Sequence, residues 1–312
     1  MKEQIINKIK ESDNIAIAMH DSPDADCIGS AFALKQALKN IGKDVDVILQ
    51  NKISTSYLKI IGSGYINKIN LPNKFYDLLI ILDCSTIDRT IDKVEKYSNY
   101  IIAIDHHIGH EPYGNLYLCE DKSSTGIILY DIIKELTSID KYIATCLYLT
   151  IIGDTNYFKN DNVNSTTYDI TSKLLSCGAD INLVKNIFQK PSLSLIRLIG
   201  NTFCDVKYDK DYKICYLMVT QEHIKQSNST YEEASQLIEY IREVENCDVA
   251  ILFLQKNNII RIKARSKNKD VSAIMKEFDG GGHKCAAGAQ IYSDNPYSTI
   301  NRVLNVAREY LK

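Results

Sequence analysis

The sequence predicts an α/β protein with two domains, a larger one built on a parallel sheet and a smaller α/β domain after it. Short, continuous apolar runs rich in β-branched residues predict strands that are buried on both faces, as in a parallel sheet. Amphipathic or apolar helical segments lie between them. From residue 205 on, alternating strands and a hairpin turn replace these runs. A chain of 312 residues is long enough for two domains of typical size.

The N-terminal domain is predicted to span residues 1–184. The run at 43–49 alternates apolar and polar residues, so we expect it to form an edge strand. Ser123, Ser124 and Thr125 stand before a helix that ends near Leu136, where their hydroxyls either cap the helix or face an anion, and capping is the expected role. The predicted strands are 14–19, 43–49, 77–83 and 100–104, and the predicted helices are 1–10, 30–40, 124–136, 141–152 and 164–177.

A helical linker at 185–204, broken by Pro191, is predicted to join this domain to a C-terminal domain at 205–312. Asn257 and Asn258 predict a hairpin turn between two strands. The predicted strands are 212–219, 249–254 and 259–265, and the predicted helices are 229–244, 271–278 and 296–310.

Composition excludes several classes of protein. The net charge is −2 and no long Lys/Arg run occurs, so we expect no grip on long duplex nucleic acid. No apolar stretch reaches the ~18 residues of a membrane span, and the charged start lacks the apolar core of a signal peptide. The nine cysteines are scattered without a Cys-x-x-Cys pair, which is typical of reduced thiols in the cytoplasm.

Acids and imidazoles follow several of the buried elements. Ligands of an open parallel sheet bind outside the carboxyl ends of its strands, so these side chains should gather at one rim. Carboxylates gathered there would repel one another unless a cation neutralised them, and mixed carboxylate and imidazole donors suit a transition-metal ion. A polar turn that caps a helix is the alternative for the first group. The residues are His20, Asp24, Asp26, Asp83, Asp105, His106, His107 and Asp154.

Three consecutive glycines near the C-terminus, Gly280–Gly282, allow backbone N–H groups to approach a ligand closely. His283 follows them directly, and Arg265 and Ser266 stand earlier in the same domain. Together these residues predict a phosphate or nucleotide pocket. A flexible turn is the alternative for the glycines, and for Arg265 the alternative is an ion pair with a surface acid such as Asp270.

The combined motifs resemble those of a known family. His20-x-x-Pro-Asp24-x-Asp26-x-x-Gly-Ser30, Asp83, Asp105-His106-His107 and Gly153-Asp154-Thr155 resemble the motifs of the DHH phosphoesterase superfamily. The segment from Arg265-Ser266 through Gly280-Gly-Gly-His283-Lys-x-Ala-Ala-Gly288 resembles the DHHA1 domain. The resemblance covers nearly the whole chain in the right order. Ala25, Cys27 and His110 depart from residues common in relatives, namely Gly, Ser and Asn.

The resemblance implies two Mn²⁺ ions, with Mg²⁺ or Co²⁺ as alternatives. One ion would be held by His20, Asp24 and Asp83, and the other by Asp26, Asp83, His106 and Asp154. His107 would face the phosphate as a donor or acid, and Asp105 would orient a histidine or the loop. Substrate would be bound by Arg265, Ser266, Gly281, Gly282 and His283, in an active site between the domains.

The activity implied by the resemblance is release of 5′-mononucleotides from very short RNA (nanoRNA) and dephosphorylation of pAp to AMP. Alternatives are hydrolysis of linear or cyclic dinucleotides such as pApA, pyrophosphate hydrolysis, and nucleotide binding by a regulator without catalysis. A complete set of metal positions argues against the regulator, and the Gly280–His283 segment argues against a pyrophosphatase. Preferred oligomer length, direction of attack and oligomeric state, including a homodimer, stay open.

Overall fold

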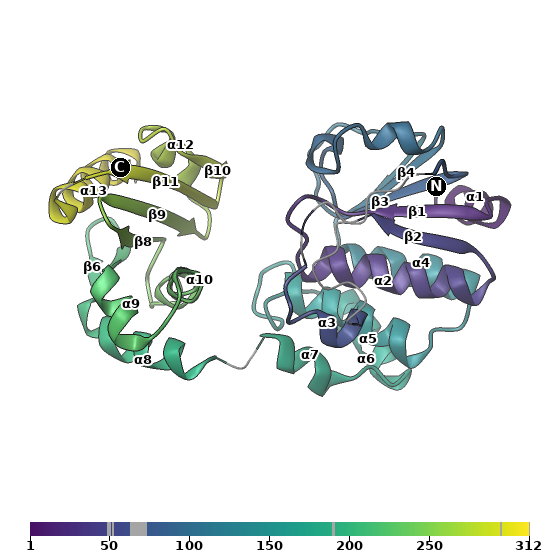
Figure 1. The fold of residues 1–312 in the computed structure, drawn as a ribbon, viewed down its shortest axis with the longest axis horizontal. Helices are drawn as coiled ribbons and strands as arrows, with labels where there is room; N and C mark the ends of the chain where they lie inside the picture. The colour runs from purple at the N-terminus through teal and green to yellow at the C-terminus, as the bar shows by residue number, and fades with distance from the viewer. Residues whose placement is uncertain (49–50, 52, 63–73, 189–190, 294, 312) are drawn as a thin grey trace. The chain divides into compact units, whose positions relative to one another are not determined.

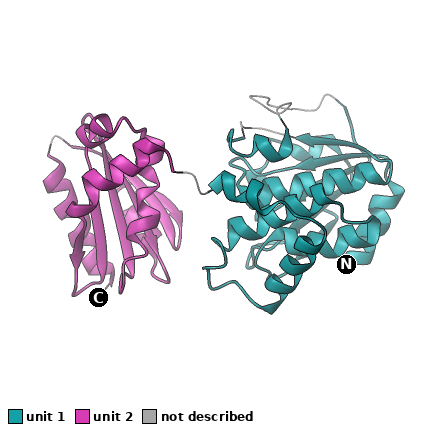
Figure 2. Cartoon of the chain, turned by 90° about the horizontal axis from the view of Figure 1, so that it is seen from below, with its two compact units in different colours: residues 1–190 teal, residues 191–312 magenta. Residues whose placement is uncertain are grey.

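The chain forms two compact units, residues 1–190 and 191–312 (Figure 2). The computed structural model describes residues 1–48, 51, 53–62, 74–188, 191–293 and 295–311. Each unit has its own sheet and hydrophobic core, parallel in the first and mixed in the second, which confirms the predicted fold class. The interval 185–204 contains the end of helix α7 (Ile181–Phe188) and all of α8 (Leu193–Thr202), while residues 189–190 lie outside the described part.

A five-stranded parallel sheet forms the centre of the first unit (Figure 1). The sheet places β2 at one edge, as predicted, although residue 49 of the predicted strand lies outside the described ranges. β5 was not predicted, because it is short and most of its side chains are only partly buried. The strand order is β2 (Asp44–Ile48), β1 (Asn14–Ala18), β3 (Leu78–Leu82), β4 (Ile101–Asp105) and β5 (Leu116–Cys119).

Helices cover one face of this sheet, as Figure 1 shows for α2 and α4. A Cβ on Gly153 of α5 would lie 2.5 Å from the Cβ of Ala25 in α2, so glycine permits this close approach of the two helices. Residues of the segment 84–97 pack on the other face. The helices of the covered face are α1 (Lys2–Glu11), α2 (Ala25–Asn40), α4 (Thr125–Leu136) and α5 (Lys141–Asp154), with α6 (Ser165–Ser176) and α7 beyond α5.

Helix α2 begins at Ala25, earlier than the predicted start near Ser30. The side chain of Asp24 accepts hydrogen bonds from the backbone N–H groups of Asp26 (3.0 Å) and Cys27 (3.1 Å), which satisfies two donors of the first turn. This cap places Asp26 inside the helix, at the end that lies near the sheet's carboxyl edge.

A six-stranded mixed sheet forms the second unit. The strands β7 and β8 are parallel, and the other neighbours are antiparallel. Of the three consecutive glycines, for which a flexible turn was an alternative, Gly281 and Gly282 form β10 together with His283. The strand order is β10 (Gly281–His283), β11 (Ala286–Tyr292), β9 (Ile259–Ser266), β8 (Val249–Lys256), β7 (Ile214–Val219) and β6 (Lys207–Asp209).

The two faces of the second sheet are covered to different extents. Helices α12 (Val271–Lys276) and α13 (Pro296–Leu311) pack on one face, against β7, β8, β9 and β11. On the other face, the core involves β7 and β8 only, so β9 and β11 keep an open side. The helices there are α8, α9 (Gln221–Ser227), α10 (Tyr231–Ser235) and α11 (Leu237–Ile241); the last two replace the single helix predicted at 229–244.

No helix within the described ranges is long and apolar enough to cross a membrane.

Candidate metal centre

The ends of β1, β3 and β4 bring the predicted acids and imidazoles together. These strands are parallel neighbours in register, with Ala18 beside Ile81 and Leu82 beside Ile104. The Nε2 atom of His106 therefore lies close to three carboxylates: 2.9 Å from Asp154 Oδ2, 3.6 Å from Asp83 Oδ1 and 3.7 Å from Asp26 Oδ2. His20 joins from the end of β1, with its Nε2 3.9 Å from Asp83 Oδ2.

Three groups of donor atoms in this cluster are close enough to hold a metal ion, each with its atoms within 4.8 Å of one another. Asp83 and His106 each belong to two groups, which is the arrangement expected of shared or neighbouring ions. The groups are Asp26, His106 and Asp154; Asp83, His106 and His107; and His20, Cys27 and Asp83.

Three residues differ from the expected ligand set: Asp24, Cys27 and His107, which was expected to face the phosphate but forms a group with Asp83 and His106. Asp24 belongs to none of these groups, because one of its oxygens caps α2 and its side chain is exposed. Cys27 belongs to one of them and was not among the predicted ligands. Its buried thiol lies within reach of His20 and Asp83 because α2 begins early enough to bring it there. From sequence, Cys27 was interpreted only as a small residue in place of Ser.

Burial controls the electrostatics of the cluster. Burial and then the Asp154 charge raise the pKa of Asp26 to about 7. Burial and then the Asp26 charge raise the pKa of Asp83 well above its ordinary value. Burial lowers the pKa of His106, but the Asp154 and Asp26 carboxylates outweigh it and raise that pKa to about 11. In the metal-free protein, Asp26, Asp83 and His106 therefore retain protons more readily than they would in water, at the place where a cation would otherwise neutralise the carboxylates.

The orientation of His106 suits a metal ligand. Its Nδ1 lies 3.0 Å from the carbonyl oxygen of Lys122, which fits an N–H at Nδ1 and a lone pair at Nε2. The buried Nε2 makes no hydrogen bond among the described residues, although carboxylates surround it. An imidazole nitrogen that faces buried carboxylates, with Asp154 Oδ2 at 2.9 Å, belongs to a donor set that suits a divalent transition-metal ion.

Asp105 holds the loop that carries both histidines. Its Oδ1 accepts hydrogen bonds from the backbone N–H groups of His106 (2.8 Å) and His107 (3.2 Å), and it lies 2.8 Å from His107 Nδ1. Burial opposes ionisation, but the His107 contact and the backbone bonds lower the pKa of Asp105. His107 is 44% exposed, so its ring is accessible while its Nδ1 is fixed.

The N-terminus of α4 binds a carboxylate of the cluster itself. The backbone N–H of Thr125 donates to Asp26 Oδ2 (2.7 Å), that of Gly126 donates to Asp26 Oδ1 (3.2 Å), and the Thr125 hydroxyl donates to Asp83 Oδ1 (3.1 Å). The positive end of the helix thereby stabilises two buried acids. Ser124 occupies the cap position but its side chain makes no capping bond, so the expected capping role is wrong and the anion at this terminus is Asp26.

Strained backbone surrounds the ligand positions. Asp83 has φ 55°, a left-handed backbone conformation that residues other than glycine, asparagine and aspartate adopt rarely. Directly after Asp154, the residues Asn156, Tyr157 and Phe158 have φ values of 45°, 59° and 63°. The side-chain amide of Asn160 donates to the carbonyl oxygen of Asp154 (2.8 Å) and closes this turn. Such strain concentrates at functional sites.

In the second unit, the predicted substrate residues Arg265 and His283 lie on one row of the sheet. Arg265 is paired with Ala286 across β9 and β11, and Ala286 is paired with His283 across β11 and β10. Directly opposed residues project from the same face, so the two basic side chains stand two strands apart, about 9–10 Å. A small alanine lies between them.

Arg265 forms the ion pair with a surface acid that was the alternative for this residue, but the acid is not the one named. Arg265 Nε pairs with Glu239 Oε1 (3.2 Å), whereas Asp270 caps α12, so Asp270 is not its partner. The Ser266 hydroxyl donates to the carbonyl oxygen of Lys269 (2.5 Å) and shapes the loop after β9. Gly282 has φ 141°, and a Cβ there would lie 2.5 Å from the Ala286 oxygen, whereas a Cβ on Gly281 would meet nothing within 4 Å.

Comparison with known proteins agrees with this geometry. Residues 14–151 match the DHH family, N-terminal domain, and residues 211–312 match the DHHA1 domain. A relative from Streptococcus mutans named "probable bifunctional oligoribonuclease and PAP phosphatase NrnA" is 28% identical, covering 93% of each chain. The bifunctional oligoribonuclease and PAP phosphatase NrnA of Bacillus subtilis is 24% identical, covering 94% of each.

Among solved structures, an exopolyphosphatase-related protein from Bacteroides fragilis superposes with a TM-score of 0.89 at 25% identity. The superposition covers 99% of this chain and 96% of that one.

Proposed function

We propose that this chain is a hydrolase of the phosphoesterase type that releases 5′-mononucleotides from very short RNA and AMP from pAp; its residues 14–151 match the DHH family, N-terminal domain, and its residues 211–312 match the DHHA1 domain. The observation that carries the proposal is the buried cluster in which His106 meets Asp26, Asp83 and Asp154. The names of the relatives, which match over nearly their whole length, supply the substrate classes.

The donor set supports a pair of Mn²⁺ ions as the cofactor, with Mg²⁺ or Co²⁺ as alternatives. We assign one ion to His20, Asp24 and Asp83 and the other to Asp26, Asp83, His106 and Asp154. Cys27 lies among the atoms of the first group and adds a soft donor beside them. Two bound divalent ions supply an activated water and charge stabilisation for in-line displacement at phosphorus.

The protein's own groups orient the reaction. Asp105 fixes the Nδ1 side of the His107 ring, so its other nitrogen is presented as a donor or acid to the phosphate oxygen that departs. Thr125 holds Asp26 and Asp83 in place through its N–H and its hydroxyl. Arg265 and His283 bind the phosphate or terminal nucleotide of the substrate, and Ser266, Gly281 and Gly282 shape the backbone around it.

A single substrate panel tests this function. The full-length protein is incubated with diadenylate, pAp, pApA and pyrophosphate, each with Mn²⁺ and each with excess chelator, and products are separated by chromatography. We expect AMP from diadenylate and from pAp with Mn²⁺ only. An Asp83→Asn variant serves as the negative control. Hydrolysis of pyrophosphate alone would support the pyrophosphatase alternative, and nucleotide binding without any turnover would support the regulator.

A further inference from the structure

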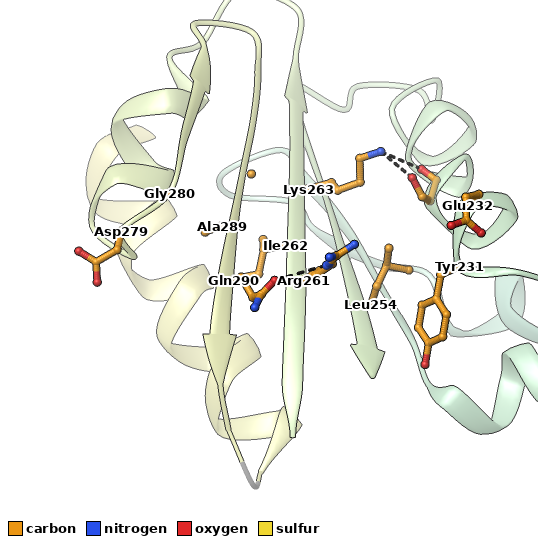
Figure 3. A pocket seen from close by; sticks show the side chains of 12 residues that line it. Tyr231, Glu232, Leu254, Arg261, Ile262, Lys263, Asp279, Gly280, Ala289 and Gln290 are labelled. Atoms are coloured by element: carbon orange, nitrogen blue, oxygen red, sulfur yellow. Dashed lines mark hydrogen bonds between the residues drawn. The ribbon is translucent and has the colours of Figure 1, made fainter. Parts of the chain in front are cut away.

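The open half of the second sheet contains a hollow of about 520 Å³ (Figure 3). Its floor is formed by β9 and β11, and α10 forms a wall. It exists because the described apolar core on this face involves β7 and β8, while β9 meets α10 and α11 through the polar contacts of Lys263 and Arg265. This hollow lies within one unit, and the residues assigned to metal ions take no part in it.

Two cations face the hollow without a carboxylate partner. Arg261 and Lys263 alternate with the buried Ile260, Ile262 and Ala264, so both project from the open side of β9. Lys263 Nζ bonds to Ser235 Oγ (2.7 Å), and Arg261 Nε bonds to Gln290 Oε1 (3.4 Å). Both partners are neutral, so neither cation is compensated by them.

The nearby acids do not compensate these charges either. Glu232 and Asp279 line the hollow, but neither forms an ion pair with Arg261 or Lys263 among the described residues, and Figure 3 shows the Asp279 carboxylate pointing away from both. Glu239, the next carboxylate along, already pairs with Arg265 and Arg242. Burial and then the Arg265 charge lower the pKa of Lys263, and the Glu239 charge opposes them.

The row of cations on β9 consists of Arg261, Lys263 and Arg265, and we assign the last of these to substrate binding. Arg261, Lys263 and Arg265 occupy every second position of one strand, so neighbouring cations stand about 6.6–6.8 Å apart, a spacing comparable with that of successive phosphates along an extended single strand. Gly288 lies opposite Lys263 and Gly281 lies beyond Gly288, so the floor beside Lys263 has no side chains and leaves room for a backbone, while Ala286 lies beside Arg265 and Gln290 beside Arg261.

We propose that Arg265, Lys263 and Arg261 bind, in this order, the phosphates that follow the scissile one along a single-stranded oligonucleotide. The inference rests on the proposed function and narrows its substrate class to strands of a few nucleotides. In β9 the row begins at Arg261, and the next position in the same register is Ile259, so this strand offers no further cation among its described residues. The ligand pAp carries two phosphates; with one at the scissile position and the other on Arg265, none is left for Lys263 or Arg261.

The test compares a double variant, Arg261→Met with Lys263→Met, against a matched control, Lys210→Met with Lys225→Met, which removes the same charge from exposed positions of the same unit. Catalytic efficiency is measured on pAp and on 5′-phosphorylated di-, tri- and tetraadenylate over a salt series. We expect the control to match the parent everywhere. The double variant should match it on pAp but fall at least about tenfold on triadenylate and tetraadenylate, and its salt slope there should be shallower by about 1.4.

Equal losses on pAp and triadenylate, or no loss on either, would overturn the inference. A second measurement separates this result from failure of the proposed function. Fluorescence anisotropy of labelled triadenylate, with chelator present to prevent turnover, reports binding by the same proteins. Suppose that the parent hydrolyses no substrate but the double variant binds triadenylate at least tenfold more weakly than parent and control. The role of Arg261 and Lys263 in binding is then supported, and the proposed function is wrong. If all proteins bind triadenylate alike, the row is not a binding site. Matching melting temperatures of the variants and parent confirm that all are folded.

Discussion

The two sheets of this protein present charge in opposite ways. At the carboxyl ends of β1, β3 and β4, Asp26 and Asp83 are buried, at 0% and 2% exposure, within a few ångströms of His106. On the open face of β9, Arg261 is exposed and Lys263 is half-buried, with neutral partners. Buried acids of one sign require a fixed counter-charge, whereas cations in contact with water tolerate its absence. The first region therefore suits a bound ion, and the second is accessible to ligands that exchange with solvent.

This contrast predicts different consequences of mutation. Changes in the buried cluster should affect the metal and the chemistry together, and changes on the open face should affect substrate binding alone. The predictions below follow in order from the largest expected effect to the smallest.

Substitution of Asp83 should have the largest effect. Asp83→Ala removes a donor shared by two of the three metal-binding groups. We expect turnover of pAp to fall by more than the 10- to 100-fold typical of residues that only support a ligand, with loss of bound Mn²⁺ measured by elemental analysis. Because Asp83 has φ 55°, alanine also strains the backbone, so Asp83→Asn is the cleaner variant. Near-normal turnover with normal metal content in both variants would contradict the assignment.

Arg265 and His283 should affect substrate and leave the metal in place. Arg265→Ala or His283→Ala removes a charge-assisted contact to phosphate, so we expect about a ten- to hundredfold loss in kcat/KM on pAp and diadenylate with unchanged Mn²⁺ binding by calorimetry. Glu239→Gln provides the control, since it breaks the ion pair of Arg265 and leaves the guanidinium present. If Glu239→Gln lowers kcat/KM as much as Arg265→Ala does, the role of Arg265 is structural.

Thr125 should show how far the helix terminus supports the buried acids. Thr125→Val keeps the size of this buried side chain and the N–H bond to Asp26 but removes the hydroxyl bond to Asp83. We expect Mn²⁺ affinity to fall about tenfold, and Thr125→Ser, which keeps the hydroxyl, to restore it. Calorimetric titration of the metal-free proteins measures both. Equal affinities for the valine variant and the parent would mean that the hydroxyl has no part in holding Asp83.

The smallest expected effect is the pH dependence of the stabilisation that Mn²⁺ gives to the folded protein. In the metal-free protein the pKa of Asp26, about 7, exceeds its ordinary 3.8, so the folded state binds a proton that the unfolded state has lost. Stability from this group is therefore lost as pH rises through that window, and the raised pKa of His106 acts in the same direction above 6.5. Since the metal replaces these protons, the rise in Tm on adding Mn²⁺ should increase by a few degrees between about pH 5 and about pH 8.

Scanning calorimetry at each pH, with and without Mn²⁺, tests this prediction. Asp26→Asn removes the titrating group and should flatten the dependence. A rise in Tm that is the same at every pH in the parent would show that protons and metal do not compete for these residues.

The sequence predicted the rim of the first sheet well because the relevant signals are local. An apolar run that ends in Asp83 or in Asp105 reveals both the strand and the position of the acid. The roles of Thr125 and Cys27 were not predicted, because they depend on distant contacts. Thr125 and Asp26 are 99 residues apart, and their hydrogen bond depends on how α4 packs beside α2. Cys27 reaches His20 and Asp83 only because Asp24 starts α2 at Ala25.

The second sheet was harder to predict because its edge is made of residues that do not favour strands. Gly281–His283 and Ala286–Ala289 carry little side-chain bulk, and their conformation comes from pairing with β9 rather than from local propensity. Arg265, Ala286 and His283 lie side by side across the sheet only because these strands pair. Residue types alone therefore indicated a ligand pocket, but its layout required the structure.

The left-handed turn after Asp154 also limits how this protein can be made more stable. Three consecutive residues, Asn156, Tyr157 and Phe158, each hold a conformation that costs about 1–2 kcal/mol outside glycine. Tyr157 packs edge-on against Phe188, and Phe158 stacks on Tyr168 at 5.2 Å, so aromatic contacts offset the strain and keep the turn closed. Glycine would relieve the strain but remove those contacts and free Asp154. Selection for heat resistance should therefore leave this turn unchanged and gather its substitutions elsewhere in the unit.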